Sequence, residues 1–392
     1  MSKGETTQAL IDRFFFLPFF HFVILYRFVM NMQETLEEVP LDITTLSRTD
    51  IWFKDGNIVL IAGSFTFKVH SGQLERQSEM FAGMLDVPQP TVQDVLDGCP
   101  VVEMHDSPDD LYHFLIALYD GLQVPFPRPV LFAHLVAVLR ISTKYIVSHL
   151  RHQCLARLKY DWPSTLEGWD AREHEASSPG GCYSPRKYTA HPILVIELAI
   201  EFGLNEILPS AFYDLSRYGP SKIMYGTPGI RSVLISPGIE PRSVCLSNQL
   251  LVRTLQGREL AQNYLIDFLS SHLENRQPSS GCWYRNSSHP SKTHPCVQAF
   301  KHMYIDIFRC IGGVSIGRDA DPLFTLAQGM DRLTRPDKSE GERARALMCG
   351  SCKVELLSDC TKGREAAWAF IPEWFGLVEE SKEVSNHESR VD

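Results

Sequence analysis

The strongest chemical pattern in the sequence is a pair of cysteines three positions apart, Cys349 and Cys352. Such a pair can point two thiolates at one metal ion, and Gly350 is expected to allow the tight turn that this requires. A tetrahedral zinc site needs two more ligands, and Cys282 and Cys296 are the candidates. The sequence therefore predicts one structural zinc ion bound by these four cysteines.

Three alternatives to this set of ligands stay open. His289 and His294 lie between Cys282 and Cys296 and are alternative donors. The two cysteine pairs are far apart and do not have the spacing of a common zinc finger, so all four could instead be ordinary reduced thiols. A redox role needs a βαβ pattern around the motif, and the surrounding sequence is helical.

Other residues that could do chemistry have simpler structural explanations. His70 follows a predicted strand and opens a predicted helix, where we expect it to hydrogen-bond to neighbouring backbone. Asp109 and Asp110 complement the positive end of a helix dipole. The sequence contains no glycine loop for phosphate, no nucleophile elbow and no zinc-protease motif. We therefore expect no enzymatic activity.

Composition places the chain among soluble globular proteins. Its 392 residues predict two or three folded units. The ten cysteines are too dilute for a secreted disulfide scaffold, which favours a cytoplasmic or nuclear location. The net charge of −9 argues against direct binding of nucleic acid.

The first 46 residues form an N-terminal extension with an apolar run at 14–30. A proline near one end and an arginine near the other interrupt this run, and it is short for a membrane-spanning helix. No cleavage pattern of a signal peptide follows it. A membrane role is therefore not the favoured interpretation.

The region after this extension begins with strands. Three β-rich runs at 50–54, 57–62 and 65–69 are separated by Asp55-Gly56 and Gly63-Ser64. Both dipeptides are hairpin signals, so three antiparallel strands in sequence order are expected. Amphipathic helical patterns then follow as far as residue 160.

The remainder of the chain is predicted to be mainly helical. Residues 161–190 contain turn formers and a charge cluster, and are interpreted as a loop or insertion. Residues 191–378 form a predicted α-helical domain, whose aromatic run at 368–375 is expected to pack on the core, with a docking motif as the alternative. Residues 379–392 lack apolar periodicity and are predicted to be disordered. The expected class is α+β.

The region 47–160 contains Asp50 at its start, a Phe67–His70 segment and a helical segment that ends at Gly121. With these motifs it resembles a BTB/POZ domain. The resemblance rests on an opening aspartate, an aromatic-x-Val-His core, two short helices and a helix that ends Leu-Tyr-x-Gly. The stretches 139–145, 209–219 and 371–377 resemble the BTB-containing proteins that are abundant in some fungi. The signature residues are Asp50, His70, Leu74, Ser78, Phe81, Tyr119 and Gly121.

This resemblance implies a non-catalytic module for self-association, as a homodimer, and for docking of protein partners. One alternative is a substrate adaptor for a cullin-type ubiquitin ligase. Another is a nuclear transcriptional regulator that acts through protein contacts. In transcriptional BTB proteins the opening aspartate pairs with a basic residue after the histidine. Here Ser71 occupies that position, which weakens the expectation of a corepressor pocket.

Overall fold

The computed structural model describes residues 45–87, 94–122, 132–176, 189–285, 294–307, 319–334 and 348–378. The chain forms two compact units, Met1–Ser47 and Arg48–Asp392, and nearly all described residues belong to the second. The apolar run at 14–30 and the predicted tail at 379–392 lie outside the described residues. No helix in the described part of the chain is long and apolar enough to cross a membrane.

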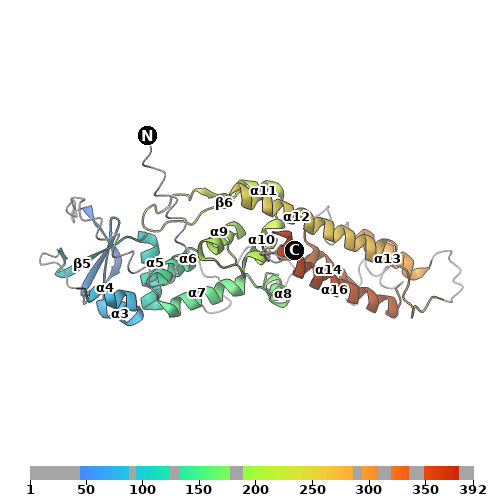
Figure 1. Ribbon diagram of the computed structural model, residues 1–392, viewed down its shortest axis with the longest axis horizontal. Helices are drawn as coiled ribbons and strands as arrows, with labels where there is room; N and C mark the ends of the chain where they lie inside the picture. Colours follow the sequence, from blue (N-terminus) through green and yellow to red (C-terminus); the bar gives the residue numbers. More distant parts are fainter. Residues whose placement is uncertain are drawn as a thin grey trace, which may run out of the picture. The chain divides into compact units, whose positions relative to one another are not determined.

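The second unit combines a small sheet with many helices, which confirms the predicted mixed class (Figure 1). The sheet has five strands in the order β1-β3-β2-β5-β4. β2 and β3 form the hairpin expected at Gly63-Ser64, with Leu60 opposite Phe67, and β5 runs parallel to β2 on its other side. The strands are β1 Ser47–Trp52, β2 Ile58–Ala62, β3 Phe65–Val69, β4 Val95–Leu96 and β5 Cys99–Met104.

The expectation that β1 pairs with β2 across Asp55-Gly56 is wrong. β1 lies beside β3, where the Thr49 hydroxyl donates to the carbonyl of Thr66 at 2.9 Å. Gly56 passes so close to β3 that a Cβ there would lie 2.9 Å from Cγ of Lys68. The turn therefore carries the chain across β3 instead of reversing it into a hairpin.

Two short helices, α3 (Ser71–Gln77) and α4 (Glu79–Leu85), follow the sheet. Ser78 caps α4 as predicted, because its hydroxyl accepts a hydrogen bond from the backbone of Phe81 at 3.1 Å. The same hydroxyl donates to the carbonyl of Tyr145. The Phe81 ring stacks on Tyr145 with centroids 4.4 Å apart, so the α3–α4 pair is fixed to the helices that follow.

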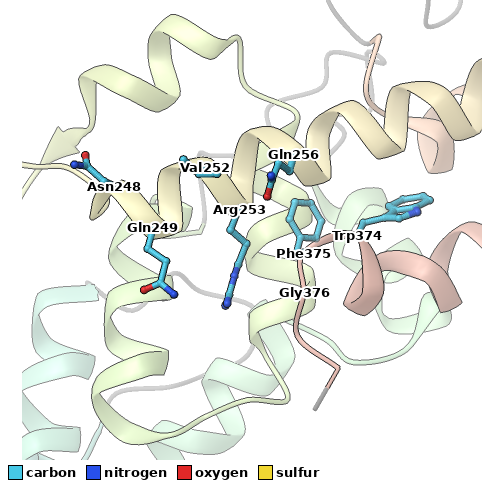
Figure 2. Close-up of a pocket in the computed structure, with 8 residues that line it drawn as sticks. All are labelled: Asn248, Gln249, Val252, Arg253, Gln256, Trp374, Phe375 and Gly376. Atoms are coloured by element: carbon cyan, nitrogen blue, oxygen red, sulfur yellow. The ribbon is translucent and has the colours of Figure 1, made fainter. Parts of the chain in front are cut away.

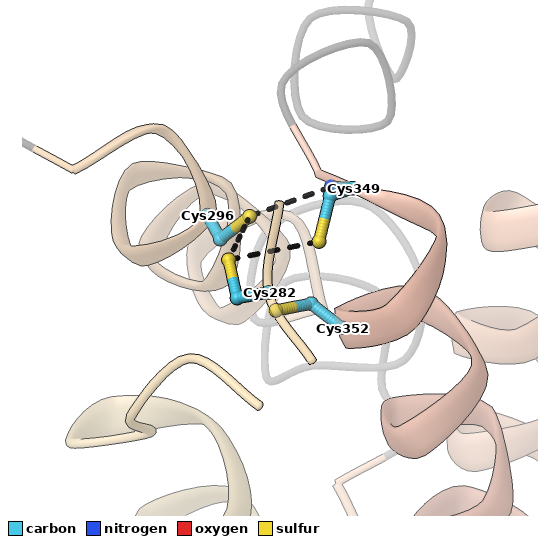
Figure 3. Close-up of side chains that lie close together, drawn as sticks. All are labelled: Cys282, Cys296, Cys349 and Cys352. Atoms are coloured by element: carbon cyan, nitrogen blue, oxygen red, sulfur yellow. Dashed lines mark hydrogen bonds between the residues drawn. The ribbon is translucent and has the colours of Figure 1, made fainter. Parts of the chain in front are cut away.

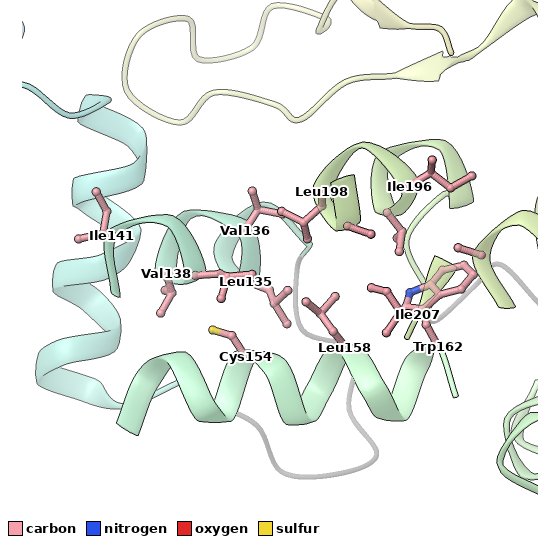
Figure 4. Close-up of a cluster of buried hydrophobic side chains, with 14 of the residues drawn as sticks. Leu135, Val136, Val138, Ile141, Cys154, Leu158, Trp162, Ile196, Leu198 and Ile207 are labelled. Carbon is pink, nitrogen blue, oxygen red and sulfur yellow. The ribbon is translucent and has the colours of Figure 1, made fainter. Parts of the chain in front are cut away.

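The main hydrophobic core joins the sheet to the helices without a break at the predicted boundary near residue 160. Cys154 and Leu158 face Leu135 and Val138, and Trp162 and Ile196 continue the same cluster beyond residue 160 (Figure 4). The same core continues into later helices through residues such as Phe212. Its helices include α5 Pro108–Asp120, α6 Phe132–Lys144, α7 Ser148–Asp161, α9 Pro192–Phe202 and α10 Leu208–Ser216.

Part of the predicted loop at 161–190 is a helix, α8 (Leu166–Glu175), so that prediction is wrong for these ten residues. The segment lacks a broad apolar face, but Trp169 is buried against the core. Arg172 is also buried, and it pairs with the buried carboxylate of Asp214 at 2.8 Å. These tertiary contacts stabilise a helix that its charged sequence does not predict.

The last part of the described chain is helical, as expected. Within it, α12 packs against α16 and α14 packs against α16 (Figure 1). Sequence analysis identifies neither α14 nor α16. The remaining elements are α11 Pro220–Tyr225, β6 Thr227–Pro228, β7 Ser243–Val244, α12 Asn248–Leu269, η2 Ser270–Glu274, α13 Pro295–Asp306, α14 Pro322–Thr334 and α16 Gly350–Trp374.

One face of the aromatic run at 368–375 packs on the core, as predicted, whereas Phe370 on the other face is 44% exposed. Ile371 and Phe375 are fully buried, and Phe375 stacks on Phe212. Phe375 also lies directly on α12, where a Cβ on Gly257 would come within 2.1 Å of its ring. Gly257 therefore sets how closely the end of α16 approaches α12.

Candidate metal centre

The four predicted cysteines come from three segments that meet at the start of α16. Cys349 is the N-cap residue of α16 and Cys352 lies in its first turn. Cys296 lies in the first turn of α13, and Cys282 lies in the turns before it. All four side chains are buried, and their Sγ atoms lie within 4.8 Å of one another (Figure 3). The four cysteines could therefore bind a metal ion such as zinc.

The distances between the sulfur atoms suit a tetrahedral zinc ion. Sγ of Cys282 lies 3.7 Å from Sγ of Cys296 and 3.7 Å from Sγ of Cys349. Four sulfurs at about 2.3 Å from zinc are about 3.8 Å apart along the edges of a tetrahedron. A disulfide bond would need about 2.05 Å, and these cysteines are free.

Two glycines let the three segments approach. A Cβ on Gly350 would lie 3.2 Å from the Trp283 ring, and a Cβ on Gly281 would lie 2.8 Å from Oγ of Ser351. The expectation that Gly350 makes a tight turn between the cysteines is wrong, because it is the first residue of α16. Its missing side chain instead makes room for the Trp283 ring.

Backbone groups donate hydrogen bonds to the cluster's sulfurs. The N–H of Cys349 donates to Sγ of Cys296 at 3.4 Å, and the N–H of Ser279 donates to Sγ of Cys352 at 3.3 Å. Three of the four cysteines also lie at helix N-termini, where the helix dipole favours negative charge. Both features stabilise thiolates, which are the form that binds metal.

The four thiols differ in acidity. Burial raises the pKa of Cys282 and of Cys296. Burial would also raise the pKa of Cys349, but hydrogen bonds from the backbone of Cys352 and Trp283 outweigh it and lower this pKa to about 7. A metal ion would displace the protons that the more basic thiols hold at neutral pH.

His294 lies beside the cluster but outside the set of four sulfurs. Its Nε2 atom is 3.9 Å from Sγ of Cys282, which suits a weak hydrogen bond to sulfur. Its Nδ1 atom is buried and finds no hydrogen-bond partner among the residues described. The other alternative donor, His289, lies outside the described residues. The geometry therefore favours four cysteine ligands with His294 as a neighbour.

A second hydrophobic core, which we call the cysteine core, surrounds the four sulfurs. It includes Phe300 from α13 and Leu356 from α16. Arg276 covers one side, with an ion pair to Asp359 at 2.7 Å and its guanidinium over the Phe300 ring. Cys282 is the most exposed of the four cysteines, at 7%. Such a closed site resembles structural zinc sites, whereas catalytic sites leave one position open.

The seven residues of the predicted BTB signature lie in the sheet, in α3 to α5 and at their ends, and make structural contacts there. The backbone N–H of His70 donates to the Tyr119 hydroxyl at 3.0 Å, and its Nδ1 lies 3.0 Å from the same oxygen. The sequence predicts that His70 hydrogen-bonds to neighbouring backbone. Its side-chain partner is instead the hydroxyl of Tyr119, which lies 49 residues further along the chain. Asp50 accepts a hydrogen bond from Tyr112. Leu74 and Phe81 are buried, Ser78 caps α4, and Gly121 ends α5 with a φ of 79°.

Sequence reasoning missed the residues that support the cysteines. Ser279 contacts Cys352 through its backbone and its hydroxyl, and this hydroxyl lies 2.9 Å from that of Ser351. The small residues just before Cys282 are the only signal that could have indicated this close approach.

Comparison with models of known protein families gives no match, and a search of curated proteins finds no similar sequence.

Proposed function

We propose that this chain is a non-catalytic protein-interaction protein, in which residues 47–160 act as a BTB/POZ-type module for self-association and partner docking. The observation that carries the proposal is an exposed apolar face on α4. Met80 is 41% exposed and Met84 is 36% exposed, one helical turn apart, and Val87 beyond the helix is 58% exposed. Flexible methionine side chains on a surface suit contact with protein partners.

The opposite side of the α3–α4 pair explains why this face points outward. Leu74 and Phe81 are buried in the main core, and the bonds of Ser78 to Phe81 and Tyr145 fix the rotation of α4. Met80 and Met84 therefore cannot turn inward without breaking this packing. Their exposure supports a role in binding.

The test of self-association is the mass of the full chain in solution. Replacing Met80 and Met84 by glutamate should convert the proposed dimer into a monomer in native mass spectrometry and light scattering. The matched control replaces Ile266 and Val354, which are 52% and 67% exposed on other helices, and should leave the dimer intact. A wild-type chain that stays monomeric at high concentration would refute the self-association.

The two alternatives from sequence differ from this proposal in their partners. A cullin-type adaptor would co-purify with a cullin scaffold, and the Met80/Met84 variant would lose that contact while the Ile266/Val354 control kept it. A nuclear regulator would accumulate in the nucleus as a tagged chain. Failure of both tests would leave self-association as the function of the module.

We also propose that Cys282, Cys296, Cys349 and Cys352 bind one zinc ion with a structural role. Zinc would compensate the charge of the buried thiolates and tie the starts of α13 and α16 to the preceding turns. X-ray absorption of the purified chain should give four sulfur neighbours at about 2.3 Å. A spectrum with fewer than four sulfurs, or a metal-free chain, would refute this set of ligands.

A further inference from the structure

A groove between the first turns of α12 and the end of α16 is not explained by self-association or by zinc. Its volume is about 540 Å³, within the range of ligand sites. Gln249 and Arg253 extend from α12 on the side where the chain passes through Gly376 (Figure 2). Val252 is 52% exposed and Trp374 is 8% exposed, whereas Phe375 behind them is buried, so the groove combines a small apolar surface with polar side chains.

Arg253 gives the groove a positive charge that no carboxylate among the described residues pairs with. No acidic residue lines the groove, and Arg253 forms no ion pair or hydrogen bond within the described parts of the chain. Arg258, just over one turn further along α12, is the useful comparison. It donates to both carboxylate oxygens of Asp319 at 2.8 and 2.9 Å and to the carbonyl of Ser216. Contacts within the fold therefore neutralise the charge of Arg258, whereas no contact among the described residues neutralises that of Arg253.

The other polar side chains suit a peptide backbone. Asn248, Gln249 and Gln256 line the groove, and each carboxamide can donate and accept hydrogen bonds, as an extended peptide requires. A guanidinium binds a carboxylate through two parallel hydrogen bonds. Val252 and the exposed part of Trp374 would contact an apolar side chain next to that carboxylate.

We propose that this groove binds a short peptide segment of another protein, in which an Asp or Glu side chain pairs with Arg253 and a neighbouring apolar side chain packs on Val252 and the exposed part of Trp374. The positive charge of Arg253 favours a ligand with an acidic side chain. This second docking site goes beyond the proposed function of residues 47–160 and does not depend on it.

The test begins with random eight-residue peptides displayed on phage and selected on the full-length chain with reducing agent and zinc present. Selected sequences should share an acidic residue beside an apolar one. A synthetic fluorescent peptide of the selected sequence then gives a dissociation constant by anisotropy. Arg253→Glu should weaken binding at least tenfold, and Arg253→Gln should weaken it less, because the glutamate also repels the ligand.

Lys362→Glu is the matched control, because it makes the same charge change at an exposed position on α16 outside the groove. It should change the dissociation constant by less than twofold. Replacing the acidic residue of the peptide by Lys should restore binding to Arg253→Glu. Melting temperatures should match, since no described residue pairs with Arg253.

Two results would overturn the proposal. One is that no acidic peptide is selected, or that selected peptides bind Arg253→Glu as tightly as wild type. The other is that peptides bind only after residues 379–392 are removed. That segment carries five acidic and two basic side chains, so such a result would make it, and not another protein, the ligand of the groove.

Discussion

Lowering free zinc should destabilise the cysteine core by an amount that mass action fixes. A ligand that binds only the folded state adds RT ln(1 + [zinc]/Kd) to the free energy of unfolding. While the site stays mostly occupied, each tenfold decrease in free zinc should therefore lower that free energy by about 1.4 kcal/mol. The 3.7 Å sulfur separations and the burial of all four cysteines predict one ion per chain and hence this slope.

Substitutions separate this metal effect from ordinary packing. Replacing Cys349 and Cys352 by serine should abolish the zinc dependence. It should also destabilise the chain, because each buried hydroxyl left without a good partner costs about 1–3 kcal/mol. The control replaces Cys154 and Cys360, which are equally buried but outside the cluster. This control variant should lose a comparable amount of stability through altered packing. Its free energy of unfolding should still fall by the full amount for each tenfold decrease in free zinc.

The assay is native-state hydrogen exchange in zinc-chelator buffers at constant pH with reducing agent. Amides of α13 and of the first turns of α16 should exchange faster as free zinc falls, while those of β2 and β3 should not change. A wild-type chain with no zinc dependence would refute the site. The same slope in the Cys349/Cys352 variant would assign the zinc effect to other residues.

Three further predictions concern the main core and its pH dependence. Phe81→Ala should cost about 3–5 kcal/mol in urea denaturation, because the buried ring stacks on its neighbours; an unchanged midpoint would contradict the placement of α4. Gly257→Ala should cost about 1–3 kcal/mol, because its Cβ would overlap the Phe375 ring; adding Phe375→Ala should make the two losses less than additive in a double-mutant cycle. Burial and the nearby His113 lower the pKa of His134 to about 4, against about 6.5 unfolded, so the unfolded chain alone gains this proton as pH falls. The stability contributed by neutral His134 is thus complete above pH 6.5 and is lost toward pH 4. His134→Gln should reduce the change of the melting temperature with pH over that window. An equal change with pH in the wild-type and the variant chain would contradict this assignment.

The sequence was informative wherever local chemistry decides the outcome. Ser78 caps α4 because a hydroxyl before a helix can accept a backbone N–H, and this preference is visible without the fold. The Cys349–Cys352 spacing is likewise local. The assignment of Cys282 and Cys296 as the second pair is not local. These two cysteines reach the site because the N-terminus of α13 lies beside the N-terminus of α16.

Features that depend on contacts between distant segments of the chain could not be predicted from the sequence. β1 pairs with β3, and the turn between β1 and β2 places Gly56 close against Lys68 of β3; a hairpin signal gives no information on such packing. α8 owes its stability to the burial of Trp169 and Arg172 against later helices. The groove at Arg253 needs the end of α16, more than a hundred residues along the chain. Only tertiary contacts create these features.

Helix α16 belongs to both cores, and this limits how far the loss of zinc can spread. Cys352 and Leu356 in its first half are buried in the cysteine core, whereas Ile371 in its second half is buried in the main core. Gly363 lies between the two halves. A Cβ there would meet the Phe268 ring at 2.4 Å, and its carbonyl accepts a 2.6 Å hydrogen bond from the Tyr264 hydroxyl on α12.

This contact holds the middle of α16 against α12 without using any cysteine. A chain without zinc should therefore lose helix from Gly350 toward Gly363 and keep it beyond, because the second half retains its own buried contacts. The exposed face of α4 and the groove at Arg253 both lie on the retained side of this boundary. Zinc removal and loss of partner binding are thus separable. An apo chain that fails to bind peptide while its main core stays protected would contradict this division.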